Sequence, residues 1–426
     1  MKVMVVGSGG REHALAWKLS RDREVESIVC CPGNPGIAEL ATCLPVTPDD
    51  ATGLLAACNE RSIDLVVFGP EEPLVKGVGE WLKGNGVNVF GPSRGAARLE
   101  GSKAFAKLFM ERHKIPTAGF RILDSYADAR ESVRGLDGRV VVKADGLAGG
   151  KGVMICTGES EAERALREIM VERRFGTAGE RVIIEEFLEG EEVSVMAICD
   201  GEDVALLPCS KDHKKVFDND RGPNTGGMGA FCPVPWIEQD LLDVIESTIM
   251  RRVVEGLAEE GSVYAGVLYA GLMLTSGGPK VLEFNCRFGD PEAQVVLPAG
   301  EFEVAQMLLE ASEGRLGRRE RLEAGSHCVC VVVCSGGYPG DYEVGKEIVG
   351  LDSLRDTDGV LVFQAGTQRR GDRLVTAGGR VLGVVGVTPT LTEARAKAYE
   401  AVRMIDFEGI HYRGDIGAKA LRGERM

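Results

Sequence analysis

Four short apolar segments in the first hundred residues each run directly into a turn rich in glycine and proline. The segments cover 2–6, 25–31, 63–68 and 87–90, and the turns follow at 7–10, 32–36, 69–71 and 91–93. Stretches with a helical pattern separate the segments, and strands that alternate with helices are typical of a parallel α/β sheet. Ligands of such sheets bind beyond the carboxyl ends of the strands. We therefore expect these turns to face a ligand.

After residue 101 the predicted strands no longer alternate regularly with helices. Ser102 is placed to cap the helix that follows it, and Thr390 begins a capping box near the end of the chain. Between these two positions the apolar pattern predicts strands at 139–144, 153–156, 181–186, 267–275, 280–285 and 329–334. A helix expected at 161–171 completes a small α+β unit with the first three of these strands.

A chain of 426 residues fits two or three domains, since a domain takes roughly 150 residues. We predict an α/β domain over 1–101 whose turns offer a site for a phosphate group. A second domain is expected over 102–320, with a subdomain at about 120–188, and an α+β domain over 321–426.

The charge balance limits the classes of partner. Lys and Arg number 50 against 65 Asp and Glu, so the formal net charge is −15. An acidic chain is a poor general binder of nucleic acid or of anionic membranes. The longest apolar run, 328–334, is far shorter than the roughly 18 residues of a membrane span. The N-terminal segment reaches Gly7 too early to supply a signal-peptide core. We expect a cytoplasmic protein without nucleic-acid or membrane partners.

Twelve cysteines are present and none forms a C-x-x-C pair. Small buried apolar side chains in a reducing compartment are the simplest interpretation. A zinc site built from His327, Cys328, Cys330 and Cys334 stays open as an alternative, although these residues lack the usual spacing.

The loop 145–152 is the strongest local signal for ligand binding. It contains Gly146, Gly149, Gly150 and Gly152 together with one lysine, and it follows Lys143. Glycines let backbone N–H groups approach an anion closely, and lysines add positive charge. The loop does not match the Walker A pattern, because a glycine follows the loop lysine and a strand comes next. A flexible hairpin turn is the alternative interpretation.

The segment Gly7-Ser8-Gly9-Gly10-Arg11-Glu12 resembles a dinucleotide fingerprint but has Glu12 at the third glycine position. This departure argues against NAD. A glycine turn at the start of a helix, with an arginine beside it, is still a good site for a small phosphate group. A tight strand-to-helix turn without a ligand remains the alternative.

Alternate residues near the end of the predicted strand 280–285 carry polar side chains. On a strand, Glu283, Asn285 and Arg287 would lie on one face at roughly 6.6 Å intervals. A carboxylate and an amide oxygen suit a Mg²⁺ ion that substrate phosphates also hold. The arginine suits a phosphoryl or carboxylate group. A solvated strand face is the alternative.

Two further segments are ambiguous when read alone. The acidic run 185–192 has the composition of an ordinary surface segment, and 210–229 mixes charges with glycines like a mobile lid or a surface loop. The histidines at 13, 113, 213, 327 and 411 are scattered, and no catalytic triad or metal-binding spacing emerges from them.

Taken together, the motifs resemble those of the phosphoribosylamine–glycine ligases, which are ATP-grasp enzymes of de novo purine synthesis. The resemblance extends from residue 2 to about residue 420, and its motifs lie at 7–14, 143–153, 185–188, 224–230 and 282–292. One departure is Gly149, where the family pattern has alanine. The resemblance implies an ATP-grasp architecture: an N-terminal parallel α/β domain, a small ATP-lid subdomain, a central ATP-grasp domain and a C-terminal α+β domain.

The resemblance also implies a role for each matching residue. ATP would be bound by Lys103, Lys143, Gly146, Gly149, Gly150, Gly152, Glu185, Phe187, Leu188 and Glu192. Mg²⁺ or Mn²⁺ would be held by Glu283 and Asn285. The chemistry would involve Arg287, Asp212 and Lys214. The substrates glycine and 5-phosphoribosylamine would be bound by Gly9, Gly10, Arg11, Gly33, Asn34, Pro70, Glu71, Asn224, Thr225, Gly226 and Gly227.

The implied reaction joins glycine to 5-phosphoribosylamine through glycyl phosphate and consumes one ATP. The family resemblance also suggests a monomer. Two other functions remain open: a different ATP-grasp carboxylate–amine ligase or carboxylase, and a nucleotide-binding protein without catalysis. The segments 221–229 and 287–292 favour the glycine ligase over the first alternative. Intact Lys143, Glu283, Asn285 and Arg287 argue against the second.

Overall fold

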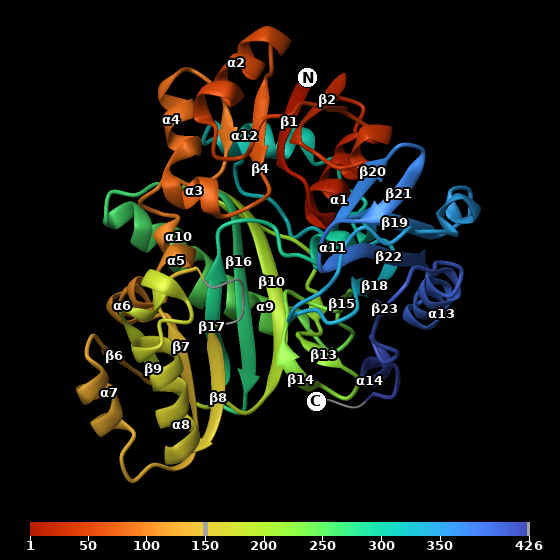
Figure 1. Ribbon diagram of the computed structural model, residues 1–426. Coiled ribbons are helices and arrows are strands. Elements are labelled where there is room, and N and C mark those ends of the chain that lie inside the picture. The colour runs from red at the N-terminus through yellow and green to blue at the C-terminus, as the bar shows by residue number, and fades with distance from the viewer. Residues whose placement is uncertain (148–151, 424–426) are drawn as a thin grey trace.

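A computed structural model of the chain describes residues 1–147 and 152–423 (Figure 1). The N-terminal region forms a five-stranded parallel sheet in the order β3-β2-β1-β4-β5. Its strands are β1 (Lys2–Gly7), β2 (Ser27–Pro32), β3 (Thr42–Cys43), β4 (Leu65–Phe68) and β5 (Val89–Phe90). The expected parallel sheet is confirmed, and β3 is an addition because two residues carry no readable pattern.

Helices alternate with these strands as predicted. They are α1 (Gly10–Leu19), α2 (Ala51–Arg61), α3 (Glu72–Lys76) and α4 (Val78–Gly84). The Gly-rich turn after β1 leads directly into α1, so the first backbone N–H groups of α1 lie at the carboxyl edge of the sheet. The geometry that favours anion binding is therefore present at this turn.

A small antiparallel unit lies at the lower left of Figure 1. Its sheet has the order β6-β9-β7-β8. The strands are β6 (Phe120–Leu123), β7 (Asp137–Ala144), β8 (Val153–Gly158) and β9 (Val182–Glu186), and the helices are α7 (Tyr126–Ser132) and α8 (Glu159–Leu166). Its buried apolar side chains form a core of their own, which includes Ala129, Val142 and Leu166. This unit packs as a separate body.

The centre of the molecule is a sheet of long strands in the order β11-β10-β16-β17. Its strands are β10 (Glu191–Asp200), β11 (Val204–Leu206), β16 (Ala265–Thr275) and β17 (Gly278–Asn285), of which the last two form the predicted hairpin. Its helices are α5 (Arg98–Gly101), α6 (Lys103–Arg112), α9 (Gln239–Ile245), α10 (Arg251–Glu259), α11 (Ala293–Ala299) and α12 (Ala305–Ser312). Ser102 caps α6 as expected, because its hydroxyl accepts a hydrogen bond from Phe105 N–H.

The C-terminal region contributes a sheet in the order β12-β15-β18-β22-β19, with β23 beside β18. The strands are β12 (Lys211–Asp212), β15 (Gly229–Cys232), β18 (His327–Ser335), β19 (Val360–Gln364), β22 (Arg380–Thr388) and β23 (Ile410–His411). Two hairpins and two helices complete the region: β13 (Lys215–Phe217) with β14 (Arg221–Asn224), β20 (Thr367–Arg370) with β21 (Arg373–Thr376), α13 (Leu391–Val402) and α14 (Ala418–Leu421). Thr390 caps α13 as predicted.

The segment 210–229, predicted as a mobile lid or a surface loop, contains the hairpin of β13 and β14 between two paired strands. β12 pairs with β15, and β15 pairs with β18 of the C-terminal sheet, while Phe217 in the hairpin is exposed. The choice between a lid and a surface loop stays a prediction. The strands are too short to show an alternating pattern, so only the tertiary pairing defines them. The predicted boundary at residue 320 remains a prediction, although strands on both sides of it share one sheet.

Two large apolar cores join the N-terminal, central and C-terminal regions, since each core contains side chains from all three. All twelve cysteines are free thiols, and only Cys43 is not fully buried. Within 1–147 and 152–423, no three His, Cys, Asp or Glu side chains are grouped to hold a metal ion, so the alternative zinc site is wrong. No helix in the same residues has the length and apolar character needed to cross a membrane.

Candidate active site

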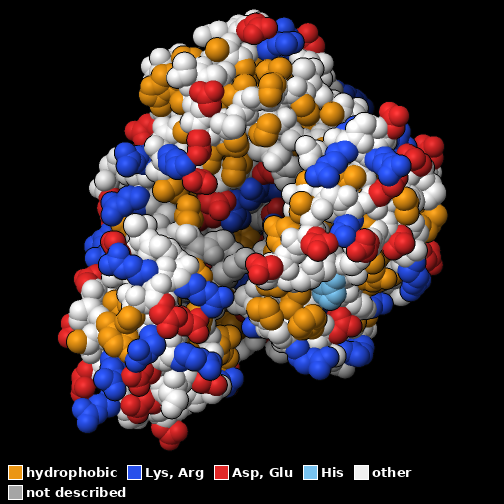
Figure 2. Space-filling view, viewed as in Figure 1, with side chains coloured by type: hydrophobic (Ala, Val, Ile, Leu, Met, Phe, Trp, Pro, Cys, Tyr) orange, Lys and Arg blue, Asp and Glu red, His pale blue; other side chains and the backbone are white. Residues whose placement is uncertain are grey.

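A cavity of about 1010 Å³ lies where the small unit, the central sheet and the two terminal regions meet. Figure 2 shows the hollow between these lobes, with acidic and basic side chains on its walls. The wall includes most of the residues that the sequence predicts for the site: Arg11, Pro70, Glu71, Lys103, Lys143, Gly152, Glu185, Phe187, Leu188, Glu192, Asp212, Lys214, Asn224, Thr225, Gly226, Glu283, Asn285 and Arg287. Residues far apart in the sequence are thus brought to one cavity.

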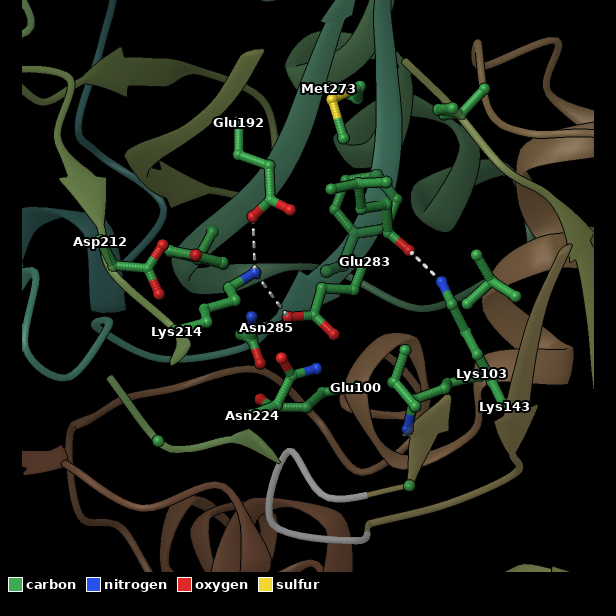
Figure 3. A pocket seen from close by; sticks show the side chains of 18 of the residues that line it. Glu100, Lys103, Lys143, Glu192, Asp212, Lys214, Asn224, Met273, Glu283 and Asn285 are labelled. Carbon is green, nitrogen blue, oxygen red and sulfur yellow. Dashed lines mark hydrogen bonds and ion pairs between the residues drawn. The ribbon is translucent and has the colours of Figure 1, made fainter. Parts of the chain in front are cut away.

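Glu283 lies at the centre of the charged residues (Figure 3). Lys214 approaches from one side, with its Nζ 3.9 Å from Glu283 Oε1 and 3.3 Å from Glu192 Oε2. Lys103 and Lys143 lie on the other side of Glu283. Burial favours the neutral acid, but Lys214, Lys103 and Lys143 together hold the pKa of Glu283 below its usual range. Glu283 is therefore a carboxylate at neutral pH.

Asp212 has an unusual environment for an acid. Burial raises its pKa to about 7, and the nearby carboxylates Glu292, Glu192 and Glu283 add to the increase, while Lys214 opposes it. Glu192, Asp212 and Glu283 overcome the effect of burial on Lys214, whose pKa is raised well above its ordinary value. The pair therefore combines a fixed cation with a carboxyl group that can exchange a proton near neutral pH.

The predicted ATP-binding lysines are held by specific oxygen atoms. Lys103 donates a hydrogen bond to the Gly146 carbonyl at 2.9 Å. Lys143 lies 2.9 Å from Glu185 Oε1 and donates to the Leu282 carbonyl at 3.2 Å. Glu185 is only 2% exposed, so its carboxylate pairs with lysine side chains and not with solvent. The adenine-binding role that the resemblance implies for Glu185 stays a prediction.

The segment after β9 forms part of the cavity wall, as the ATP prediction requires. Phe187 lies under the guanidinium of Arg139, with 4.0 Å between the guanidinium carbon and the ring centroid. Leu188 is buried. Gly146 is not on the wall, and its φ of +97° explains the need for glycine. Gly149 and Gly150, which were also predicted to bind ATP, lie outside the described residues.

Arg287 follows β17 and connects the strand to the N-terminal region. Its guanidinium lies 3.2 Å from Glu71 and 2.9 Å from Glu100, and it donates a hydrogen bond to Asn285 Oδ1 at 3.2 Å. Arg287 and Arg11 lower the pKa of Glu71 despite its burial. Burial raises the pKa of Glu100 to about 7, although Arg287 opposes the rise. The predicted face of Glu283, Asn285 and Arg287 is thus formed, with Arg287 turned towards two acids.

The predicted phosphate-binding turns reach the cavity only in part. Arg11, Pro70 and Glu71 are on the wall, whereas Gly9, Gly10, Gly33 and Asn34 are not. The Asn34 side chain is occupied by backbone groups: Nδ2 donates to the carbonyls of Ser8 and Gln364 at 2.8 Å each, and Oδ1 accepts from two N–H groups. Asn34 therefore braces the turn, and direct substrate contact by these four residues stays a prediction.

Side chains of the C-terminal region hold the turn 224–227 in place. Arg380 donates hydrogen bonds to the carbonyls of Gly226 and Asp290, at 2.6 and 2.8 Å, and its guanidinium lies 3.0 Å from the Asp290 carboxylate. Gly226 N–H donates to the Tyr338 hydroxyl at 3.0 Å. Gly227 lies just off the wall at a φ of +112°. The turn is therefore a fixed structure whose shape depends on side chains 112 and 154 residues away.

Several residues of the site were missed from the sequence. Lys107, Glu100, Tyr269, Glu292 and Arg380 all line the cavity. Lys107 had a readable signal, since it follows Lys103 by four positions and so shares its helix face. Glu292 accepts hydrogen bonds from Tyr269 and Ser194 at 2.9 and 3.2 Å. Glu292 ends the motif 282–292, whereas Tyr269 and Arg380 come from distant segments that no local pattern marks.

The donor atoms at the end of β17 fit a magnesium ion. Glu283 is ionised and about one-third exposed to the cavity, and Asn285 on the same strand face supplies an amide oxygen. Hard oxygen ligands of this kind hold Mg²⁺ together with substrate phosphates. The lysines on the far side of Glu283 are placed to share such phosphates.

The sequence matches three domain models of phosphoribosylglycinamide synthetase. The N domain matches residues 1–100, the ATP-grasp (A) domain 101–293 and the C domain 328–419. The chain belongs to the phosphoribosylglycinamide synthetase family. The predicted family and the ATP-grasp architecture are confirmed by these matches.

Individual relatives agree with the family assignment. A phosphoribosylamine–glycine ligase of Caldanaerobacter subterraneus subsp. tengcongensis is 46% identical over 98% of this chain and 100% of its own length. The human trifunctional purine biosynthetic protein adenosine-3 is 45% identical over 99% of this chain, which spans only 42% of that protein. The crystal structure of a phosphoribosylamine–glycine ligase from Thermotoga maritima has a TM-score of 0.86 at 38% identity and covers 98% of this chain and 100% of that chain.

Proposed function

We propose that this chain is an ATP-dependent carbon–nitrogen ligase that joins glycine to 5-phosphoribosylamine, giving glycinamide ribonucleotide, ADP and phosphate. The observation that carries the proposal is the centre of the cavity, where ionised Glu283 lies between Lys214 and the pair Lys103 and Lys143. Alternating positive and negative side chains of this kind suit phosphoryl transfer from one oxygen atom to another, because they can stabilise the charge of the transferred group.

The first step forms glycyl phosphate. A carboxylate oxygen of glycine attacks the γ-phosphorus of ATP, a new O–P bond forms, and the bond to the bridging oxygen of ADP breaks. Lys103 and Lys143 bind the phosphates, and Arg287 stabilises charge on the transferred group or the glycine carboxylate. Mg²⁺ held by Glu283 and Asn285 would neutralise further phosphate charge. Positioning and charge do this work without a nucleophilic side chain.

The second step forms the amide. The amine nitrogen of 5-phosphoribosylamine attacks the acyl carbon, a C–N bond forms, the C–O bond to phosphate breaks, and the nitrogen loses a proton. Asp212 is suited to accept that proton, because burial and the neighbouring acids place its pKa close to 7. Lys214 keeps a positive charge beside it. Asn224–Gly227 would bind the substrates opposite the phosphates.

The remaining parts of the proposal follow from the sequence. A monomer as the catalytic unit stays a prediction from the family resemblance. Mn²⁺ could replace Mg²⁺ on the same oxygen ligands. The cytoplasmic location stays a prediction, as do domains bounded at residues 101 and 320.

The test is ADP release with ATP and Mg²⁺, with glycine and freshly generated 5-phosphoribosylamine each present or omitted. We expect sustained ADP release only when both are supplied. Equal rates with other amino acids, or without 5-phosphoribosylamine, would instead favour a different ATP-grasp ligase. No release under any condition would favour a nucleotide-binding protein without catalysis.

A further inference from the structure

Two lysines share one buried carboxylate beside the cavity. Glu185 Oε2 lies 2.8 Å from Lys107 Nζ, and Glu185 Oε1 lies 2.9 Å from Lys143 Nζ. The three side chains come from β9, α6 and β7, so they join the small unit to the central region. None of the three residues is more than 6% exposed. Water therefore screens their charges poorly.

The two lysines are held differently. Lys107 donates a hydrogen bond to Thr117 Oγ1 at 2.8 Å, and Thr117 in turn donates to the Val281 carbonyl at 2.7 Å. Lys107 is thus tied to the neutral hydroxyl of a residue that is itself anchored to β17. Lys143 has Glu185 and one longer hydrogen bond, of 3.2 Å, to the Leu282 carbonyl. Lys143 is therefore the easier of the two to displace.

The carboxylate would obstruct ATP binding if Lys143 were its only partner. A lysine that turns towards nucleotide phosphates must give up at least part of its contact with Glu185. A buried carboxylate left without a cation is strongly unfavourable. With Lys107 still 2.8 Å from Oε2, Glu185 stays neutralised after Lys143 moves.

We propose that Lys107 is a positioning residue that keeps Glu185 paired and so allows Lys143 to engage the phosphates of ATP. The inference rests on the proposed function in one respect, because it takes Lys143 as a phosphate ligand. Lys107 itself need not touch the nucleotide. Its charge acts through Glu185.

The test measures binding of the non-hydrolysable analogue AMP-PNP with Mg²⁺ by calorimetry, together with steady-state kinetics. Lys107→Gln keeps hydrogen-bonding groups but removes the charge, and Lys107→Met serves as a second neutral variant. Both should bind AMP-PNP more weakly, on the order of tenfold. The KM for ATP should rise by a similar factor, while kcat changes less.

A second substitution separates this role from a structural one. Glu185→Gln in the Lys107→Gln background removes the charge that retains Lys143, and it should restore most of the lost affinity. A residue that merely supports the fold would give additive losses instead. Lys280→Met is the matched control, because Lys280 pairs with the neighbouring Glu186 at 2.8 Å on the exposed side of the same strand. It should leave AMP-PNP affinity unchanged.

The outcomes are distinct. Unchanged AMP-PNP affinity in folded Lys107→Gln and Lys107→Met proteins would overturn the proposal, as would a loss that Glu185→Gln deepens. A wild-type protein that binds AMP-PNP but makes no product would contradict the proposed function alone.

Discussion

The cavity has two halves that are built in different ways. The nucleotide half uses charged side chains from α6, β7, β17 and the segment around β12, and these face one another directly: Lys103, Lys143, Lys214 and Glu283. The N-terminal half reaches the wall through Arg11, Pro70 and Glu71, and the backbone turns behind the wall are held in place by other side chains. There the Asn34 side chain bonds four backbone groups, and Arg11 pairs with Glu12 at 2.7 Å.

The difference predicts two kinds of mutational effect. In the nucleotide half a substitution removes a charge that acts on the reacting groups, so turnover should fall. In the N-terminal half a substitution changes the shape of a turn, so substrate affinity and stability should fall while chemistry persists. The three predictions that follow test this contrast in order of expected size.

Glu283→Gln should have the largest effect. It keeps the size of the side chain but removes the carboxylate that is placed to hold Mg²⁺ between Lys214 and Lys103. We expect kcat to fall by on the order of 10²–10³-fold or more, with an unchanged melting temperature. Glu343→Gln, on an exposed carboxylate paired with Lys346, is the control. A kcat within a few-fold of wild type would remove Glu283 from the site.

Asn34→Ala should have an intermediate effect confined to the N-terminal half. Four backbone groups lose their partner, among them the Ser8 carbonyl in the turn before α1. We expect a roughly tenfold higher KM for 5-phosphoribosylamine, equivalent to about 1.4 kcal/mol, and a lower melting temperature.

Asn34→Asp sharpens this prediction, because it retains the oxygen that accepts from Gly36 and Ile37 but loses both donated hydrogen bonds. The second carboxylate oxygen would face the carbonyl oxygens of Ser8 and Gln364, so the effect should be at least as large as that of alanine. Weaker AMP-PNP binding in Asn34→Ala would break the contrast, since the two halves would then not be independent.

His13→Asn should have the smallest effect on turnover, and what it changes is the dependence of stability on acidic pH. Burial lowers the pKa of His13 to about 4, and its Nδ1 accepts a hydrogen bond from Gln364 N–H at 2.8 Å. The unfolded chain binds the proton more readily between pH 4 and about 6.5, so His13 lowers stability as the pH falls through this range. Asparagine keeps an acceptor but does not titrate.

Urea unfolding at pH 7 and pH 4.5 measures this difference. Wild type should lose about 2 kcal/mol more than His13→Asn between the two values. Equal losses in the two proteins would show that the junction of α1 with the C-terminal region does not depend on a neutral imidazole.

The sequence predicted the nucleotide half far better than the N-terminal half. Glu283 and Asn285 share a strand face, as their spacing predicts, whereas the phosphate-binding role of the glycine loop stays a prediction. Lys107 was missed although it shares a helix face with Lys103. The role of Asn34 could not be read, because one of its partners is the carbonyl of Gln364, 330 residues away.

The same difference between local and distant contacts decides which parts of the fold could be predicted. Long or turn-bounded strands such as β1, β16 and β18 follow from apolar pattern alone. The pairing of β12 and β15 with the C-terminal sheet does not, because strands of two and four residues have no readable period. Arg380 begins β22 of the same sheet, so it can reach Gly226 only when the distant strands have paired.

In the proposed reaction the cavity activates glycine at its carboxylate with the γ-phosphate of ATP. The most direct test is the reaction of glycine labelled with ¹⁸O in both carboxylate oxygens, together with ATP, Mg²⁺ and 5-phosphoribosylamine. Mass spectrometry of the phosphate product decides it. We predict one ¹⁸O atom in each phosphate released, because the acyl C–O bond breaks in the second step. Phosphate without ¹⁸O, formed alongside glycinamide ribonucleotide, would contradict the account.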